Sequence, residues 1–308
     1  MAPPVFLIDL FRLCLWLAIL AIIFVPLERF FAIHPSQIWR KQTGIDLGYY
    51  FLGGLILGPL LSLPLGLLAW AAHVVTPSAI QTMLSGLPLW ARIALAMIAG
   101  DAGYYWGHRL MHRMPVLWRF HAIHHSAEQV DFLVNTRAHP VDLVFGRLSG
   151  AIPIYALGLA APAGAADALI TTVVMLAGTI WGFLIHANLR WRFGPLAHVL
   201  VTPAFHHWHH AWHPADRNFA SLLPVFDRLF GTFHLPRAAW PGRYGIKDAM
   251  PETLGGQLIQ PLLGSVPAAR SSEVDCNLKR ESPSSRQNPG HDRVNLTRSR
   301  SKPGETFP

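Results

Sequence analysis

The stretch "RFHAIHHSAE" at residues 119–128 contains the motif H-x-x-H-H, and "FHHWHHAWHP" at residues 205–214 repeats that spacing. A third motif, "HRLMH" at residues 108–112, has two histidines four residues apart. The eight histidines of these motifs are His108, His112, His121, His124, His125, His206, His209 and His210. On an α-helix, residues three or four apart lie on one face, so each motif can direct two or three imidazoles toward one point.

This spacing predicts a metal site. Imidazoles beside apolar segments cost free energy unless they are hydrogen-bonded or bound to metal. Eight nitrogens exceed the four ligands of a closed zinc site, so two ions are expected, although imidazole also suits Zn, Cu, Fe and Ni. Cys14 and Cys276 match no metal or redox spacing, and the motifs contain no carboxylate of the H-E-x-x-H kind. The ligands should therefore be nitrogen or oxygen.

The composition is that of a membrane protein. Hydrophobic residues make up 52% of the 308 residues and charged residues 14%, against roughly 25% charged in soluble proteins. The apolar stretches are 5–26, 47–72, 87–106, 143–161 and 168–185. The first could be a cleaved signal peptide, but no small-residue cleavage site follows it. The second contains Pro59 and Pro64 and could cross once or re-enter as two half-helices, so four to five spans are expected.

Basic residues indicate the orientation. Lys and Arg concentrate in 28–46, 107–142 and 186–308, and the links 73–86 and 162–167 contain none. Because Lys and Arg accumulate on the cytoplasmic side, the histidines are expected to face the cytoplasm, in an integral protein of a bacterial inner membrane. The net charge of +8 fits this interpretation better than nucleic-acid binding.

The predicted fold is all-α, an integral membrane helical bundle of four to five spans with a cytoplasmic helical metal-binding cap. The end of the chain is rich in Ser, Arg, Pro and Asn, which is typical of disorder. The predicted regions are an N-terminal transmembrane region at 1–93, a histidine-bearing domain at 94–233 with a transmembrane hairpin at about 143–185, a C-terminal extension of the cap at 234–267 and a disordered tail at 268–308.

These motifs resemble the sterol desaturase and fatty acid hydroxylase superfamily of integral membrane di-iron oxygenases. The family pattern of H-x(3,4)-H followed by two H-x-x-H-H motifs is met in order, and "TRAHP", "HANLRW" and "DRNFASLLPVFDRLFGTF" also look like family segments. The resemblance covers about residues 90–260. It implies that 94–233 is a di-iron domain which uses two Fe and O2 to oxidise a C–H bond of a lipid.

The resemblance also implies that His186 in "HAN" is a ninth ligand. From spacing alone His213 remains possible, whereas His207 points off the shared face. A ligating ring usually donates its other N–H to a carboxylate or carbonyl. Candidates for such supporting contacts are Asp101, His139, Asp216 and Asn218. Asp101 could equally be a helix-end charge, and His139 a further ligand.

The reducing electrons must come from another protein, because the sequence has no dinucleotide-binding loop, no iron–sulfur cysteine set and no haem-binding His-Pro-Gly-Gly. A ferredoxin or a small cytochrome with its reductase, docking on the basic face, is expected. The alternatives are a His-rich membrane zinc-binding or zinc-transport protein and a His-ligated metallohydrolase. The spans carry few of the ionisable residues that an ion path needs, and the motifs lack a general-base carboxylate.

The substrate is expected to be a membrane lipid: a sterol, a fatty acyl chain or a related apolar chain. Hydroxylation, desaturation and ether cleavage all begin with the same hydrogen abstraction, so the sequence leaves the product open. Phe219-Ala220 stands where the family usually has Tyr-Gly, and Pro224-Val225 also departs from it. These departures leave the subfamily open as well.

Overall fold

The computed structural model describes residues 4–35, 38–159, 165–237 and 239–263, without the side chains of 165–168. The long helices are α1 (Val5–Phe31), α2 (Thr43–Val75), α4 (Leu89–Arg113), α6 (Pro140–Ala156) and α7 (Ala165–His186). The short ones are α3 (Ser78–Ser85), α5 (Pro115–His125), α8 (Pro203–His210), α9 (Val225–Leu229), α10 (Leu254–Ile259) and the 3-10 turns η1 (Phe132–Thr136), η2 (Gly194–His198) and η3 (Gln260–Leu262). The described residues form no β-strand, which confirms the predicted all-α class. The predicted tail at 268–308 lies outside them.

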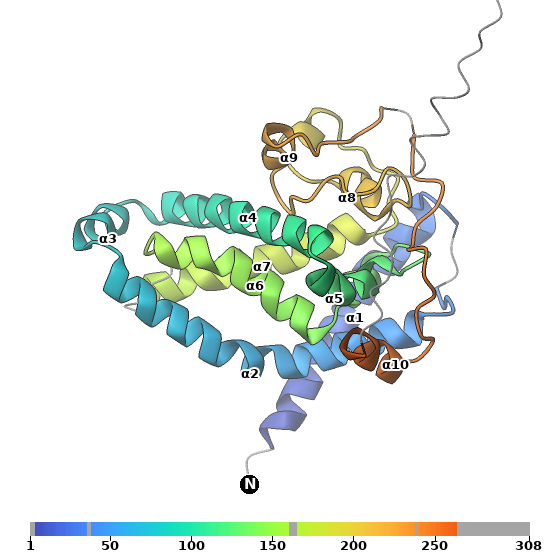
Figure 1. Cartoon of the computed structure of the whole chain (residues 1–308), viewed down its shortest axis with the longest axis horizontal. Coiled ribbons are helices and arrows are strands. Elements are labelled where there is room, and N and C mark those ends of the chain that lie inside the picture. The colour runs from blue at the N-terminus through green and yellow to red at the C-terminus, as the bar shows by residue number, and fades with distance from the viewer. Residues whose placement is uncertain (1–3, 36–37, 160–164, 238, 264–308) are drawn as a thin grey trace, which may run out of the picture. The chain divides into compact units, whose positions relative to one another are not determined.

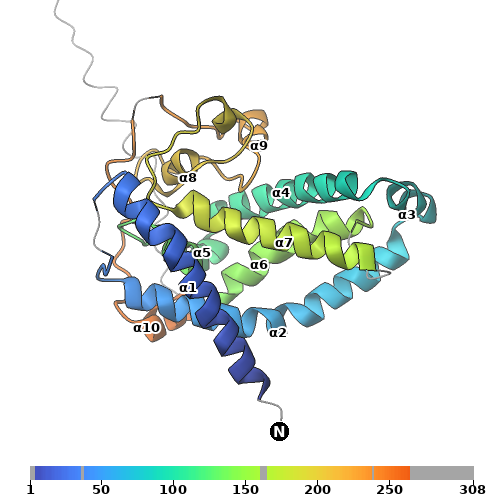
Figure 2. The ribbon, with the colours of Figure 1, turned by 180° about the vertical axis from the view of Figure 1, so that it is seen from behind.

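The helices α2, α4, α6 and α7 run beside one another, and α5 and α8 lie at one end of this group (Figure 1). Small residues let α4 and α6 approach closely: a Cβ atom added at Gly103 would lie 2.2 Å from the carbonyl oxygen of Ser149. From behind, α1 crosses the group (Figure 2), and its Phe24 packs on Phe132 of η1 and Phe183 of α7. The histidine-bearing helices are thus held against the apolar bundle.

Three described helices are long and apolar enough to cross a membrane: α1, α2 and Leu169–His186 of α7. Large apolar side chains such as Phe11 and Trp70 are exposed on the first two, as expected for surfaces that face lipid. The predicted spans at 87–106 and 143–161 form α4 and α6, but neither belongs to these three. The number of four to five spans stays a prediction.

The question of re-entry at 47–72 has an answer in the structure. α2 continues through both Pro59 and Pro64 as one 33-residue helix. A pair of re-entrant half-helices is therefore not formed. Prolines are tolerated in apolar helices because local adjustments satisfy the carbonyl groups that they leave without an N–H donor.

The chain after α7 is largely irregular between its short helices, and buried polar side chains hold it in place. Asp101 of α4 accepts hydrogen bonds from the backbone N–H groups of Ser221, Leu222 and Leu223 and from the Ser221 hydroxyl. Asp227 accepts from two further backbone N–H groups of the same loop and from a threonine hydroxyl. The helical cap predicted here is, in the described residues, mostly a loop structure tied to α4.

A cluster of charged residues joins the start of α2 to η1. Asp46 accepts hydrogen bonds from the guanidinium groups of Arg40 and Arg137, and Arg40 also pairs with Asp131. The side chains of Asp46 and Arg137 have no exposed surface. Since the carbonyl oxygen of Arg137 contacts His124, this cluster also supports the histidine site.

Candidate metal centre

Proline-led helix starts place the histidines. Pro115 and Pro203 occupy the first turns of α5 and α8. The backbone N–H groups of a first turn have no acceptor within the helix, so a proline there loses no hydrogen bond. Thr202 caps α8 by accepting a hydrogen bond from the N–H of Phe205. The eight motif histidines and His186 are all buried. The predicted helical geometry of both H-x-x-H-H motifs is therefore present.

The nine histidines form two groups, within each of which the ligand atoms lie within 4.8 Å of one another. We call them site A (His108, His112, His121, His125 and His209) and site B (His124, His186, His206 and His210). The two sites are adjacent, since the ring centroids of His125 and His210 are 4.6 Å apart. His186, inferred only from the family resemblance, lies in site B.

Each H-x-x-H-H motif divides between the two sites, which differs from the prediction that one motif serves one point. The i, i+4 pair of α5 points into site A and its i+3 histidine, His124, into site B. On α8 the assignment is reversed: the i, i+4 pair points into site B and His209 into site A. At about 100° per residue, position i+4 lies ~40° to one side of position i around the helix axis, and position i+3 lies ~60° to the other side. A helix between two sites can therefore serve both.

Hydrogen bonds fix the Nδ1 atoms of several histidines in both sites. In site A, His108 Nδ1 donates to the carbonyl of Phe219 (2.7 Å) and His121 Nδ1 to the carboxylate of Asp142 (2.9 Å). In site B, Nδ1 of His124 donates to the Arg137 carbonyl and Nδ1 of His186 to the Gly182 carbonyl (3.1 and 2.7 Å). Carbonyl oxygens can only accept, so these rings carry their proton on Nδ1 and a lone pair on Nε2.

Those lone pairs face one another. The Nε2 atoms of His108 and His121 are 3.1 Å apart, and those of His124 and His186 are 3.2 Å apart. Two ligands bound at right angles, each about 2.1 Å from one ion, would be separated by about 3 Å. The buried Nε2 of His209 has no hydrogen-bond partner among the described residues. Each group fits one cation, because a cation removes the repulsion between facing lone pairs.

The charge state of the histidines suits this role. Burial, and then the neighbouring imidazoles, hold the pKa values of His124, His125, His206, His209 and His210 well below the usual range. Buried imidazoles are neutral because no water solvates the charged form. Neutral imidazole is the form that binds metal.

Two histidines near the sites belong to neither. His207 uses both ring nitrogens elsewhere, at 2.7 Å from the Tyr244 hydroxyl and 3.0 Å from the carbonyl of Ala187. Its prediction as a residue pointing off the shared face agrees with this placement. His213, which spacing left possible, is exposed and outside both groups.

The predicted supporting residues divide. Asp216 contacts His112 Nδ1 at 3.0 Å, as expected. The other three form no hydrogen bond with a histidine of either site: Asp101 holds the 221–223 loop, Asn218 bridges Phe205 and His234, and His139 caps α6 and contacts the Leu258 carbonyl. Their polar atoms are already satisfied by backbone groups, so these assignments were wrong.

Asp142 is a supporting residue that the motif analysis missed. It is buried, and its side chain is 8% exposed against 53% for Asp216. The signal in the sequence was the lone carboxylate at the start of an apolar stretch, three residues after His139.

Replacing Asp142 by alanine should lower metal affinity or activity about 10- to 100-fold, because His121 would lose the acceptor that fixes its tautomer. Asp216→Ala should cost less, since water can reach this exposed position and replace the carboxylate. Metal content and turnover of the two variants test this ranking. Equal losses, or a larger loss in Asp216→Ala, would show that Asp142 does not orient His121.

A cavity of about 390 Å³ leads from the sites into the bundle. Histidines of both sites line one end of it, and its walls come from α2, α4, α6 and α7, with apolar residues such as Leu61, Ile170 and Val174. Ala220, one of the residues that departs from the family pattern, also lines it. The backbone N–H of Ala220 bonds Asp227, which any residue could do, so this departure changes the cavity wall and not the loop.

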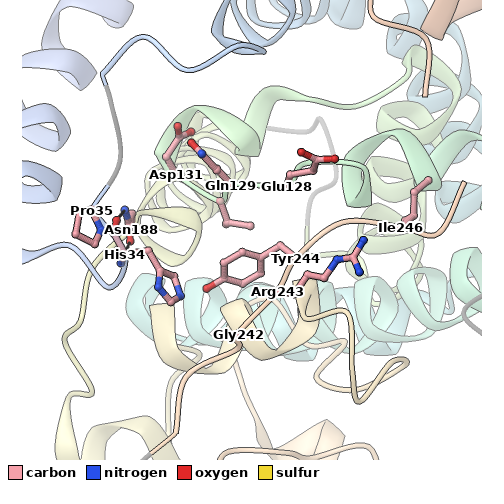
Figure 3. Close-up of a pocket in the computed structure, with 11 residues that line it drawn as sticks. His34, Pro35, Glu128, Gln129, Asp131, Asn188, Gly242, Arg243, Tyr244 and Ile246 are labelled. Atoms are coloured by element: carbon pink, nitrogen blue, oxygen red, sulfur yellow. Dashed lines mark hydrogen bonds between the residues drawn. The ribbon is translucent and has the colours of Figure 1, made fainter. Parts of the chain in front are cut away.

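A second pocket, of about 370 Å³, is polar and is lined by Glu128, Asp131, Asn188, Arg243 and Tyr244 among others (Figure 3). Glu128 follows His125 by three residues and Asn188 follows His186 by two. Tyr244 of this pocket contacts His207, whose other nitrogen bonds the residue after His186. The pocket is thus linked to the surroundings of site B.

Comparison with known proteins agrees with the motifs. Residues 93–232 match the family model "Fatty acid hydroxylase". The chain is 34% identical over 177 residues to ornithine lipid hydroxylase OlsE of Rhizobium tropici, covering 56% of this chain and 51% of that protein. It is 35% identical over 141 residues to alkylglycerol monooxygenase of Danio rerio, covering 45% of this chain and 30% of that one. No solved structure matches it significantly.

Fold and site together define an all-helical protein with membrane-spanning candidates and two buried histidine groups. Residues 93–232 therefore form a fatty acid hydroxylase domain, which confirms the family predicted from the motifs. The matches span about half, or less, of the relatives' own lengths.

Proposed function

We propose that this chain is a membrane-bound, O2-dependent di-iron oxidoreductase that hydroxylates or desaturates a lipid. The observation that supports this most is that histidines of both groups line a mostly apolar cavity. An alkyl chain fits such a cavity, because its burial is favourable and needs no polar partners. Proteins with family matches to this chain include a lipid hydroxylase and an alkylglycerol monooxygenase.

Two iron ions, one in each site, are the proposed cofactor. Site A offers five imidazoles and site B four, and neither includes a thiolate. Bound iron would supply the reduction of O2 and the oxidation of a C–H bond. The protein itself orients the imidazoles through Asp142 and backbone carbonyls, and keeps water from the alkyl chain with the apolar wall.

Hydroxylation is favoured over desaturation by the names of the relatives. Ornithine lipid hydroxylase and alkylglycerol monooxygenase both insert oxygen, as their names state. A double bond or a cleaved ether would need the same histidine sites. The identity of the product is therefore a question for mass spectrometry.

The electron donor is proposed to be a separate ferredoxin, or a small cytochrome with its reductase. The protein is proposed to lie in a bacterial inner membrane with its histidine sites toward the cytoplasm, on the side where the basic residues concentrate. The polar pocket beside site B offers an approach for such a donor that does not pass through the lipid cavity.

Metal analysis and lipid analysis test this proposal. Protein purified without oxygen from an iron-fed host should contain close to two metals per chain, and lipids of a deletion strain should differ from those of the complemented strain by one oxygen or by two hydrogens. A content of one zinc per chain would contradict the di-iron site, although zinc can replace iron at imidazole sites during overproduction. Activity that returns with iron, and not with zinc, resolves that case. Loss of a headgroup instead of oxidation would indicate a metallohydrolase.

A further inference from the structure

Arg147 lies on α6 and lines the lipid cavity together with Tyr104 of α4 and Gly150 of its own helix. Its neighbours on the cavity wall include Leu143, Ala151 and Ile154. A guanidinium group among apolar residues of a membrane protein is costly unless something compensates its charge. Such residues usually serve function in membrane proteins, and the question is what pairs with this one.

The carboxylates that could pair with Arg147 are already engaged. Asp101 accepts hydrogen bonds from the 221–223 loop, and Asp142 holds His121. Among the residues that the structure describes, Arg147 forms no hydrogen bond, no ion pair and no stacking contact with an aromatic ring. Its guanidinium nitrogens are not fully buried, and Arg147 lines the cavity, so these nitrogens are open to the cavity.

We propose that Arg147 binds an anionic group of the lipid substrate, a carboxylate or a phosphate. This inference rests on the proposed function and specifies its substrate class. A guanidinium presents a planar fork of donors that matches either anion in a bidentate manner. The anion compensates the positive charge of Arg147, which no carboxylate of the described residues does. A neutral lipid would leave this charge uncompensated and should bind less tightly.

The position of Arg147 also bears on which carbon is oxidised. Asp142 marks the level of His121 on α6, and Arg147 follows it by five residues, which is about 7.5 Å along the helix axis. The anionic group and the metal sites are therefore close on the scale of a lipid. The oxidised carbon should lie near the anionic end of the substrate, with the rest of the alkyl chain directed toward Ile170 and Val174.

Binding can be measured without turnover. Purified protein in detergent is titrated with oleate or methyl oleate, and in a second pair with dioleoyl phosphatidate or dioleoylglycerol, and the thermal midpoint is recorded. A ligand that binds the native state raises the midpoint according to its affinity. The first pair tests a carboxylate and the second a phosphate, with the alkyl chains held constant.

In the wild-type protein, the anionic member of at least one pair should bind at least about tenfold more tightly than the neutral member. Arg147→Met should remove that preference, and Arg147→Lys should keep part of it, because lysine retains the charge and loses the fork. The matched control is Arg12→Met, which removes an exposed arginine from apolar helix α1 and should leave the preference unchanged.

Equal stabilisation of the wild-type protein by both members of each pair would overturn the inference, even if Arg147→Met failed to fold. So would an undiminished preference in Arg147→Met. A preference for anionic lipids in protein that has no oxygenase activity would instead leave the anion site standing and count against the proposed function. The two proposals can therefore fail separately.

Discussion

Replacing His124 by alanine should abolish turnover and reduce bound metal from about two to about one per chain. His124 is the member of α5 that points into site B, where its Nε2 lies 3.2 Å from that of His186. Without it, site B keeps three imidazoles. The ligands of site A come from other positions, so the first ion should remain bound.

His207→Ala is the matched control, because His207 is also a buried histidine beside a ligand. Both of its ring nitrogens are hydrogen-bonded to groups outside the sites, so its loss should cost about 1–3 kcal/mol of stability while both metals stay bound. Metal content and turnover of the folded variants decide the question. Equal loss of metal in the two variants would mean that the geometry of α8 differs from the helix described.

That these histidines gather in one buried region was largely predictable, because their spacing follows helix periodicity. Histidines at i, i+3 and i+4 can share a face only on a helix, and this also separates His207 from its neighbours. The division of each motif between two sites was not predictable in this way. It depends on which elements pack on either side of α5 and α8, and that information lies in contacts with α4 and α7.

The supporting residues were mostly missed, for two physical reasons. Backbone carbonyls, such as those of Phe219, Arg137 and Gly182, orient three rings and leave no mark in the sequence, since any residue has one. Carboxylates do leave a mark, but proximity along the chain is a poor guide. Asp142 is 21 residues from the ring it holds, whereas Asn218, close to the last motif, hydrogen-bonds the backbone of Phe205 in α8 and of His234 and no ring of either site.

The positions of the helices were predictable from the sequence. Which of them are apolar enough to span a membrane, and whether a proline ends one, were less predictable. A long helix occupies most of each of the five apolar stretches, as their length and apolar character predict. Whether a proline bends or ends a helix depends on what its neighbours can satisfy, and α2 continues through two of them. The second half of α4 carries the first histidine motif, so α4 is long but not apolar enough along its whole length to count among the candidate spans.

The charged cluster at the start of α2 should be the most sensitive part of the scaffold. Asp46 lies between Arg40 and Arg137, and the side chains of all three are at most 5% exposed. Removing one partner from a buried ion pair leaves charges that neither water nor protein compensates. Asp46→Ala leaves the guanidinium of Arg137 in this state, and Arg40 keeps only Asp131.

We therefore expect Asp46→Ala to lower the free energy of unfolding by about 3–5 kcal/mol, which for many membrane proteins means little folded product. Because the carbonyl of Arg137 holds His124, the metal of site B should be lost first as this region loosens. Asp9→Ala is the control: Asp9 pairs with Arg12 at 3.6 Å, the two side chains are 45% and 71% exposed, and exposed pairs contribute only about 0–1 kcal/mol. Denaturation of both variants in the same detergent measures the difference, and a loss in Asp46→Ala no larger than in Asp9→Ala would show that the cluster does not hold α2 to η1.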